Sequence, residues 1–288
     1  MVLMRVPFVK MHGAGNDFVM IDDRAGSFPE DPRLIAEIAP RGVGIGCEGV
    51  VLVQESARAD FKMRFFNPDG SEAAMCGNGA RCVAAFAREI GAARVDRMRF
   101  ETRAGDVAAE VVGPGLVKIS LPDPRDLREN FVNSGVPHAI VPVADVAAAD
   151  VAGEGRRLRN SAEFAPDGAN VDFVEYCPPG RLAMRTYERG VEAETGACGT
   201  GAVAAALVGV AQHGLSFPVR VETSLGYELV VDGAWDGRRF SSVTLTGPVK
   251  RVFDGVVDVP DAPCACAEAG SMVSFAESAG GSCPQGNA

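Results

Sequence analysis

Two cysteines occur in the same short sequence motif, one in each half of the chain. Residues 75–82 read MCGNGARC and residues 197–202 read ACGTGA, so Cys76 and Cys198 are each followed by Gly-x-Gly-Ala. A single buried thiol beside a tight turn is common and chemically inert. Two thiols in equivalent places can act as a pair, because one can take a proton while the other donates one.

The motif belongs to a longer repeat. Met63 precedes the first cysteine and Met184 the second, 121 positions apart (184 − 63). An Ala-rich apolar run that ends at a glycine follows each cysteine, which predicts a helix beginning at the cysteine in both halves. Alternating segments from Arg99 and Arg220 have the same spacing and predict paired strands. These matches in one order indicate an internal duplication of about 120 residues.

The duplication predicts two domains of one fold, in the α+β class. Residues 1–122 are expected to form the first domain, which contains Cys76, and residues 123–247 the second domain, which contains Cys198. When duplicated domains pack about a pseudo-twofold axis, equivalent elements meet at the interface, where small-molecule sites often form. The two cysteines are therefore expected to face each other. Residues 261–288 are rich in Gly, Ala and Ser and are predicted to form a disordered tail.

A cysteine at a helix N-terminus stands where unpaired backbone N–H groups can hold a carboxylate and depress the pKa of a thiol. Two such cysteines suit inversion at the α-carbon of an amino acid, since a thiolate removes the proton from one face and a thiol returns one to the other. The helix ends would stabilise charge developing on the carboxylate. No Schiff-base lysine or nucleotide-binding glycine signature is evident, so we expect no cofactor.

The composition excludes several classes of partner. The net charge is −10 at pH 7 and no basic run alternates with aromatic residues, so nucleic acid is not expected to bind. The longest apolar stretch, residues 202–211, is too short to span a membrane, and no signal peptide opens the chain. We therefore expect a cytoplasmic protein with no membrane partner. The eight cysteines lack zinc-type spacing, which predicts free thiols and no metal site.

Six motifs fall in one order across the two halves: HGAGNDF (12–18), FFNPDGS (65–71), MCGNGAR (75–81), VPH (136–138), ERG (188–190) and ACGTGA (197–202). Together they resemble the diaminopimelate epimerase family over roughly residues 5–257. The resemblance implies two similar α+β domains, each a central helix wrapped by a curved, mostly antiparallel sheet, with the active site in the cleft between them. It also implies that residues 248–260 form a strand returning to the first domain, and that the protein is a homodimer.

The resemblance implies interconversion of LL- and meso-diaminopimelate without pyridoxal phosphate, a step of lysine and peptidoglycan precursor synthesis. Cys76 and Cys198 correspond to the acid/base pair. Glu188 and His138 correspond to residues that tune the thiol pKa values, and Glu188 would also meet the reacting amino group. The backbone cradle for the carboxylate corresponds to Gly77, Asn78, Gly199 and Thr200. The polar residues that hold the substrate correspond to Asn16, Asn67, Asn170 and Arg189, with the arginine suited to the distal carboxylate.

Some of these residues also have structural explanations. Taken singly, Asn67 fits an Asx turn, His138 a loop and Arg189 a surface ion pair. Two positions depart from the family, which often has Asn in place of Val136 and Gln in place of Gly49. Two polar contacts to the substrate are therefore expected to be missing.

Other functions stay open. A cofactor-independent racemase or epimerase of proline, hydroxyproline or another amino acid would keep the fold and mechanism, although relatives of that kind usually carry CGHG at the first cysteine. A phenazine-type isomerase of the same fold lacks the cysteine pair. A non-catalytic amino-acid-binding protein would keep the cradle but would leave both cysteines unexplained. Cys47, Cys82 and Cys177 are expected to be structural.

Overall fold

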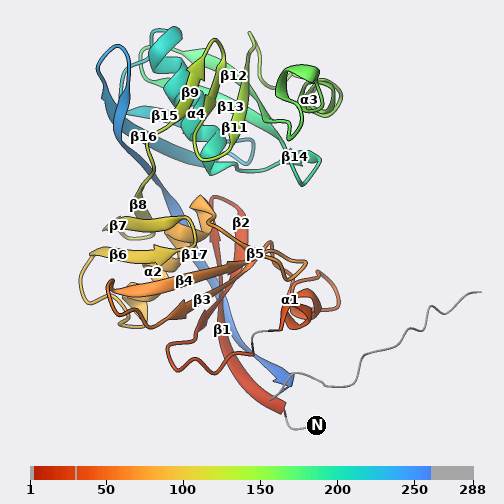
Figure 1. Cartoon of the computed structure of the whole chain (residues 1–288), viewed down its shortest axis with the longest axis vertical. Coiled ribbons are helices and arrows are strands. Elements are labelled where there is room, and N and C mark those ends of the chain that lie inside the picture. The colour runs from red at the N-terminus through yellow and green to blue at the C-terminus, as the bar shows by residue number, and fades with distance from the viewer. Residues whose placement is uncertain (1–2, 30, 261–288) are drawn as a thin grey trace, which may run out of the picture.

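The computed structural model describes residues 3–29 and 31–260, so the tail expected at residues 261–288 lies outside the described residues. Figure 1 shows two lobes stacked along the long axis, with helix α2 (Gly77–Glu89) in one and α4 (Gly199–Gln212) in the other. Each helix begins at the residue after one of the repeated cysteines. Both helices predicted from the Ala-rich runs are thereby confirmed.

The first lobe wraps its strands around α2. Its strands are β1 (Leu3–Gly13), β2 (Asn16–Asp22), β3 (Val50–Gln54), β4 (Phe61–Phe66), β5 (Glu72–Ala73), β6 (Arg97–Thr102), β7 (Gly105–Gly113) and β8 (Leu116–Ser120), joined by β17 (Phe240–Pro260). The main pairing runs β1, β2, β3, β4, β6, β7, β8, and β17 then pairs with both β8 and β1. β17 closes this circle, and α2 inside it contacts strands β1, β2, β3, β4, β7, β8 and β17.

The second lobe repeats this topology. Its strands are β9 (Arg125–Arg128), β10 (Phe131–Asn133), β11 (Pro137–Pro142), β12 (Asn170–Cys177), β13 (Arg181–Glu188), β14 (Ala193–Thr195), β15 (Val219–Glu222) and β16 (Glu228–Trp235). From β10 to β15 the pairings are antiparallel, parallel, antiparallel and parallel, as they are from β1 to β6. The strand order therefore carries the same duplication as the sequence.

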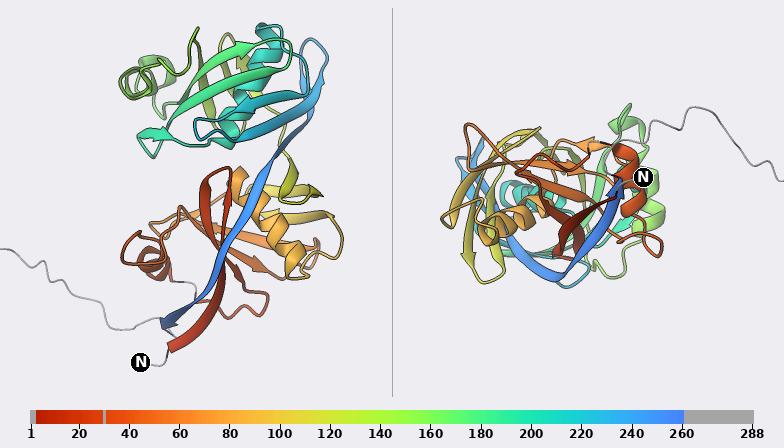
Figure 2. Two further views of the ribbon diagram at one scale, coloured as in Figure 1. Left: turned by 180° about the vertical axis from the view of Figure 1, so that it is seen from behind. Right: turned by 90° about the horizontal axis from the view of Figure 1, so that it is seen from below.

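The two central helices are built from small apolar residues because strands approach them closely. α4 reads GTGAVAAALVGVAQ and is buried from Ala202 to Gly209, so it needs no polar face. α2 buries Ala80, Cys82, Val83, Ala84, Phe86 and Ala87 in the same core cluster. Figure 2 shows both helices cradled by strands when the molecule is seen from behind. The expected α+β fold, with a helix wrapped by a curved sheet in each half, is confirmed.

The remaining helices cover the outer faces of the sheets. α1 (Pro32–Ile38) packs Leu34 and Ile35 into a cluster with residues of β1, β2 and β3. α3 (Val151–Arg159) contacts β12 and β13, and the short 3₁₀ helix η1 (Ala162–Phe164) follows it. Each lobe thus has a helix inside its sheet and another outside.

Strand β17 joins the lobes. Its first part pairs with β16 and β8, and its residues from Val249 to Pro260 pair with β1. Figure 2 shows it running the length of the molecule towards the N-terminus. The division of the chain into residues 1–122, 123–247 and 248–260 stays a prediction, since one unbroken strand belongs to both lobes.

Candidate active site

The two repeated cysteines cap the two central helices. Cys76 is the N-cap residue of α2 and Cys198 the N-cap residue of α4, and both have the extended backbone that precedes a helix. The Cys198 sulfur accepts the Gly201 N–H at 3.3 Å and lies 3.5 Å from Thr200 Oγ1. Each thiol therefore stands at the positive end of a helix, beside first-turn amides that lack partners within the helix.

The two helix ends lie against each other. Asn78 Nδ2, in the first turn of α2, donates to the Ala197 carbonyl oxygen at 3.1 Å, one residue before Cys198. The same nitrogen donates to Asn16 Oδ1 at 3.1 Å, and the Cys76 sulfur lies 3.8 Å from that oxygen. One asparagine thus connects the surroundings of both cysteines.

A buried cluster around His138 adjoins Cys198. His138 Nδ1 lies 2.7 Å from Asp172 Oδ2, and both side chains are fully buried. Because a carboxylate only accepts, Nδ1 carries the proton, and in the neutral ring Nε2 is the acceptor. Thr200 Oγ1 lies 3.0 Å and Asn170 Nδ2 3.3 Å from Nε2. A chain of polar contacts therefore runs from the Cys198 sulfur through Thr200 to His138 and Asp172.

Glu188 acts electrostatically on both cysteines. Thr195 Oγ1 donates to Glu188 Oε2 at 2.7 Å. Burial raises the pKa of the Glu188 carboxyl, an effect that the Thr195 hydrogen bond and His138 oppose. The carboxylate in turn raises the pKa of the Cys76 and Cys198 thiols. Glu188 therefore lies within electrostatic range of both sulfurs.

The thiols do not have the depressed pKa values expected from their helix ends. Burial is the largest effect at both sulfurs and raises both pKa values, with the pKa of Cys198 well above its ordinary range. Nearby backbone N–H groups lower these pKa values, but by less than burial raises them. The expectation was wrong for the free protein because it counted the helix end alone and not the burial of the sulfurs, which has the larger effect.

The side chains of two expected site residues, Asn67 and Arg189, make no hydrogen bond to the cluster around His138 in the described residues. Asn67 Nδ2 donates to Ser71 Oγ at 3.0 Å within the NPDGS turn, as an Asx-type explanation predicts. The Arg189 backbone N–H donates to Asn170 Oδ1 at 2.7 Å, while its guanidinium makes only long contacts, 3.4 and 3.5 Å, to two carbonyl oxygens. In the described residues, neither side chain has a hydrogen bond to another expected site residue.

The sequence missed three residues of this region. Asp172 holds the His138 ring, and its signal was present in NVDFVEY, where it follows Asn170 by two and so faces the same side of β12. Glu48 accepts a hydrogen bond from Asn16 Nδ2. Arg81, fully buried, donates to Asn78 Oδ1 at 2.7 Å. The expected structural cysteines are elsewhere: Cys47 and Cys82 are buried and Cys177 is exposed.

The glycine at position 49, where the family often has glutamine, has a steric explanation. A Cβ atom at Gly49 would lie 2.4 Å from the Phe65 ring and 3.0 Å from the Phe66 carbonyl oxygen. Phe65 therefore fills the space that a longer residue 49 would need. The departure at Val136 has no such explanation in its contacts.

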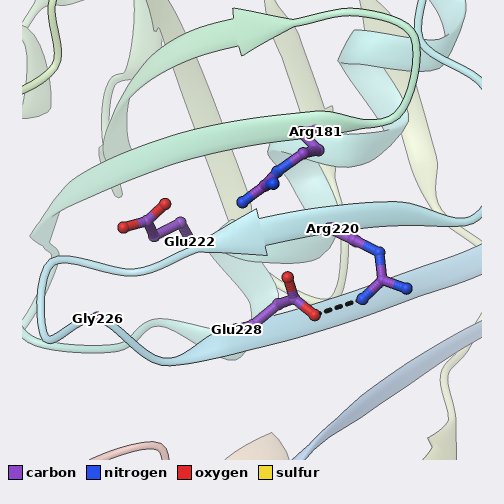
Figure 3. A pocket seen from close by; sticks show the side chains of 5 residues that line it. All are labelled: Arg181, Arg220, Glu222, Gly226 and Glu228. Atoms are coloured by element: carbon purple, nitrogen blue, oxygen red, sulfur yellow. Dashed lines mark hydrogen bonds and ion pairs between the residues drawn. The ribbon is translucent and has the colours of Figure 1, made fainter.

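A pocket elsewhere on the second lobe holds none of the expected residues. Figure 3 shows it on the surface of β13, β15 and β16, with Arg220 and Glu228 joined by a 2.5 Å ion pair. It is lined by Arg181, Arg220, Glu222, Gly226 and Glu228.

Among residues 3–29 and 31–260 no group of side chains could hold a metal ion. No helix in this part of the chain is long and apolar enough to cross a membrane.

Solved structures share the fold at low sequence identity. A PhzF-family phenazine biosynthesis protein of Bacillus anthracis has a TM-score of 0.68 at 15% identity, over 88% of this chain and 99% of that one. A probable proline racemase of Agrobacterium radiobacter K84 has a TM-score of 0.64 at 18% identity, over 88% and 92%. At these identities the likeness establishes the architecture alone.

Sequence comparison goes further. Diaminopimelate epimerase of Aquifex aeolicus is 42% identical over 279 residues, covering 86% of this chain and 96% of that protein. Diaminopimelate epimerase of Chlorobaculum tepidum is 40% identical over 258 residues, covering 86% and 99%. The model of the diaminopimelate epimerase family matches residues 8–123 and 130–252. With its paired helix-capping cysteines and its two wrapped helices, this chain belongs to the diaminopimelate epimerase family.

Proposed function

We propose that this protein interconverts LL-2,6-diaminopimelate and meso-diaminopimelate by two-base proton transfer between Cys76 and Cys198, without a cofactor. The reaction would serve lysine and peptidoglycan precursor synthesis. The observation that carries the proposal is the meeting of two helix N-termini, each capped by a cysteine, through the hydrogen bond from Asn78 to Ala197. Inversion requires bases on two faces of one carbon, and a cysteine at each of two adjoining helix ends supports the proposal that the two thiols are these bases.

The proposed step balances without any other reactant. One cysteine, as thiolate, takes the α-proton, and the electron pair of the C–H bond passes into the carboxylate. The other cysteine, as thiol, gives its proton to the opposite face, so that thiol and thiolate exchange places. The first-turn amides of Gly77, Asn78, Gly199 and Thr200 would hold the carboxylate, where preorganised donors stabilise the developing charge.

The raised thiol pKa values give the substrate a part in activation. Glu188 raises the pKa of both thiols, and its carboxylate is the proposed partner of the substrate ammonium group. An ammonium group beside Glu188 would offset that negative charge and so make a thiolate easier to form. We propose that the protein holds two neutral thiols when empty. One thiol loses its proton to bulk water as the substrate binds, which leaves the reactive thiolate and one neutral thiol.

The rest of the substrate would lie among Asn16, Asn67, Asn170 and Arg189. Arg189 has only long contacts from its guanidinium to the Asp167 and Gly168 carbonyl oxygens, so its planar fork is available to a carboxylate. The side-chain oxygen Oδ1 of Asn170 already accepts the Arg189 backbone N–H, which fixes the backbone that carries this fork.

The test is proton NMR of LL-diaminopimelate in D₂O with the purified, reduced protein and no added cofactor. Loss of the α-proton signal together with appearance of the meso isomer supports the proposal. No exchange by folded protein contradicts it. L-Proline and hydroxyproline run in parallel would detect the alternative racemase. Substrate binding without exchange would indicate the alternative binding protein.

We also propose a cytoplasmic homodimer. Large apolar side chains are exposed on the paired outer parts of β1 and β17, which suits contact with a second copy. They are Leu3, Val252, Phe253 and Val256. Light scattering should give twice the monomer mass, and a Val252→Asp, Phe253→Asp double variant should reduce it. A monomeric wild-type protein at micromolar concentration would contradict the dimer.

A further inference from the structure

Arg81 is a buried cation without a carboxylate partner in the described chain. It lies on α2 with no measurable exposure. Burial lowers the pKa of its guanidinium, and negative charge on the Cys82 or Cys76 sulfur would oppose that effect. Its Nε has no hydrogen-bond partner among the described residues. Burying a charge in this way is costly unless an anion or a set of acceptors compensates for it.

The guanidinium lies where the two helix ends meet. Arg81 Nη2 donates to Asn78 Oδ1 at 2.7 Å, and Nη1 lies 3.4 Å from the Gly77 carbonyl oxygen. A Cβ atom at Gly199, the first residue of α4, would be 3.9 Å from Nη1, and one at Gly247 of β17 would be 3.0 Å from Nε. The charge therefore lies close to the first residue of α4 and to β17 as well as to the first turn of its own helix.

The hydrogen bond to Asn78 fixes the orientation of an amide. A guanidinium only donates, so the Asn78 oxygen must face Arg81 and the nitrogen must face Asn16 and the Ala197 carbonyl. The Asn16 oxygen is turned to Asn78 in consequence, and its nitrogen is turned to Glu48. One buried donor thus sets the direction of polar groups from α2 to the surroundings of Cys76.

We propose that Arg81 is a positioning residue of the carboxylate cradle, which fixes the Asn78 amide and supplies the buried positive charge that a bound carboxylate balances. The inference rests on the proposed function for the identity of the carboxylate. The fixed amide and the charge next to Cys76 are properties of the empty protein, so they can be measured whether or not diaminopimelate is the substrate.

The test compares Arg81→Met, Arg81→Lys and the control Val83→Ala, a buried position two residues along α2. Two quantities are measured: kcat/KM with LL-diaminopimelate, and the pH profile of Cys76 alkylation by iodoacetamide, followed by peptide mass spectrometry. Thermal unfolding shows which variants are folded. The alkylation needs no turnover, so an inactive wild-type protein would contradict the proposed function and leave the inference about Arg81 testable.

We expect Arg81→Met to lower kcat/KM by roughly 10- to 100-fold, the range for lost hydrogen bonds to a charged group. Its Cys76 alkylation profile should move to higher pH. Arg81→Lys should restore the alkylation profile, because the charge is kept, but only part of kcat/KM, because the fork that holds Asn78 is lost. Val83→Ala should change thermal stability and neither of the other quantities.

Two results would overturn the inference. One is a folded Arg81→Met variant with a wild-type alkylation profile and kcat/KM within twofold of the control. The other applies if Arg81→Met does not fold: an Arg81→Lys variant that loses thermal stability while kcat/KM stays at the wild-type value would assign Arg81 to packing alone.

Discussion

Asn78 Nδ2 donates a hydrogen bond to the Ala197 carbonyl oxygen, 3.1 Å away and 119 positions along the chain. This contact joins the first turn of α2 to the residue before the N-cap of α4. Because each helix is enclosed by its own strands, the lobes can bring the two helix ends together only at their facing surface. The chemistry proposed for this protein depends on that meeting.

Replacing either cysteine of the pair should remove turnover and keep the fold. We expect Cys76→Ala and Cys198→Ala to lower kcat by at least ~10³-fold, since each direction of inversion needs both an acid and a base. Binding of diaminopimelate, measured by calorimetry, should fall far less because the backbone cradle is intact. Cys177→Ser, at an exposed thiol, is the control and should keep full activity. Wild-type turnover in either alanine variant would eliminate the two-thiol mechanism.

The free thiols should be slow to react at neutral pH. Burial raises the pKa of both Cys76 and Cys198, so the thiolate fraction, and with it the rate of alkylation, should rise about tenfold per pH unit up to at least pH 9. Glu188→Gln should shift both profiles to lower pH, because the carboxylate raises both pKa values. A plateau in the alkylation rate below pH 8 would show that the helix ends outweigh burial after all.

Glu188 should also make the stability of the folded protein depend on pH. Its pKa is raised in the folded protein above the ordinary value of about 4.3, so the folded state holds this proton more tightly than the unfolded state. The stability that this gives is fully present below about pH 4 and is lost as pH rises through the folded pKa. Glu188→Gln does not ionise, so its thermal stability relative to wild type should increase from pH 4 to pH 8.

The control for Glu188 is a carboxyl with the opposite shift. Arg64 holds the pKa of Glu72 below its ordinary value, so Glu72 adds stability above the unfolded pKa and loses it in acid. Glu72→Gln should therefore become less stable relative to wild type as pH rises. If both variants gave the same slope of relative stability against pH, the assignment of Glu188 as a buried carboxyl with a raised pKa would be wrong.

The Asp172–His138 pair should matter through the tautomer of the ring. In Asp172→Asn an amide N–H can face Nδ1, which would place the proton on Nε2 and reverse the contact with Thr200. We expect kcat to fall by roughly 10²- to 10⁴-fold, where the upper figure is the loss known when the carboxylate that orients a catalytic histidine is changed to an amide. Thr186→Val removes the other hydrogen bond of Asp172 and should cost less than ~10-fold. Equal losses in the two variants would indicate a general packing defect.

The sequence predicted the features that depend on local patterns, namely the two central helices and the repeat. The helices after Cys76 and Cys198 follow from Ala-rich runs that end at glycine, and the repeat follows from motifs at one spacing. Asp172 was missed because a single carboxylate in an apolar strand gives no sign of its partner until β11 and β12 are paired, with His138 opposite Asn170. Arg81 was missed for a related reason, since an arginine on a helix is usually exposed.

The low pKa values expected for the two thiols were wrong for a similar reason, because they depend on tertiary packing. The helix N-terminus is readable from the sequence, and it does lower the pKa of each thiol. The burial of the sulfurs depends on the tertiary packing around them, and its effect on both pKa values outweighs that of the helix end. The packing of Gly49 against Phe65 could not be predicted either, because it depends on the register of β3 and β4.

Because of this register, the protein has no room for a side chain at position 49, where the family often has glutamine. A side chain at Gly49 would meet the Phe65 ring at 2.4 Å and the Phe66 carbonyl oxygen at 3.0 Å, so Gly49→Gln should destabilise the protein by ~1–3 kcal/mol, as overpacking does. Phe65→Leu alone should cost about 1–2 kcal/mol. In the double variant the smaller leucine leaves room for glutamine, so its cost should be less than the sum of the two, as a double-mutant cycle by urea unfolding would measure. Strict additivity would show that the backbone oxygen of Phe66, which cannot move aside, sets the limit at this position instead of the ring.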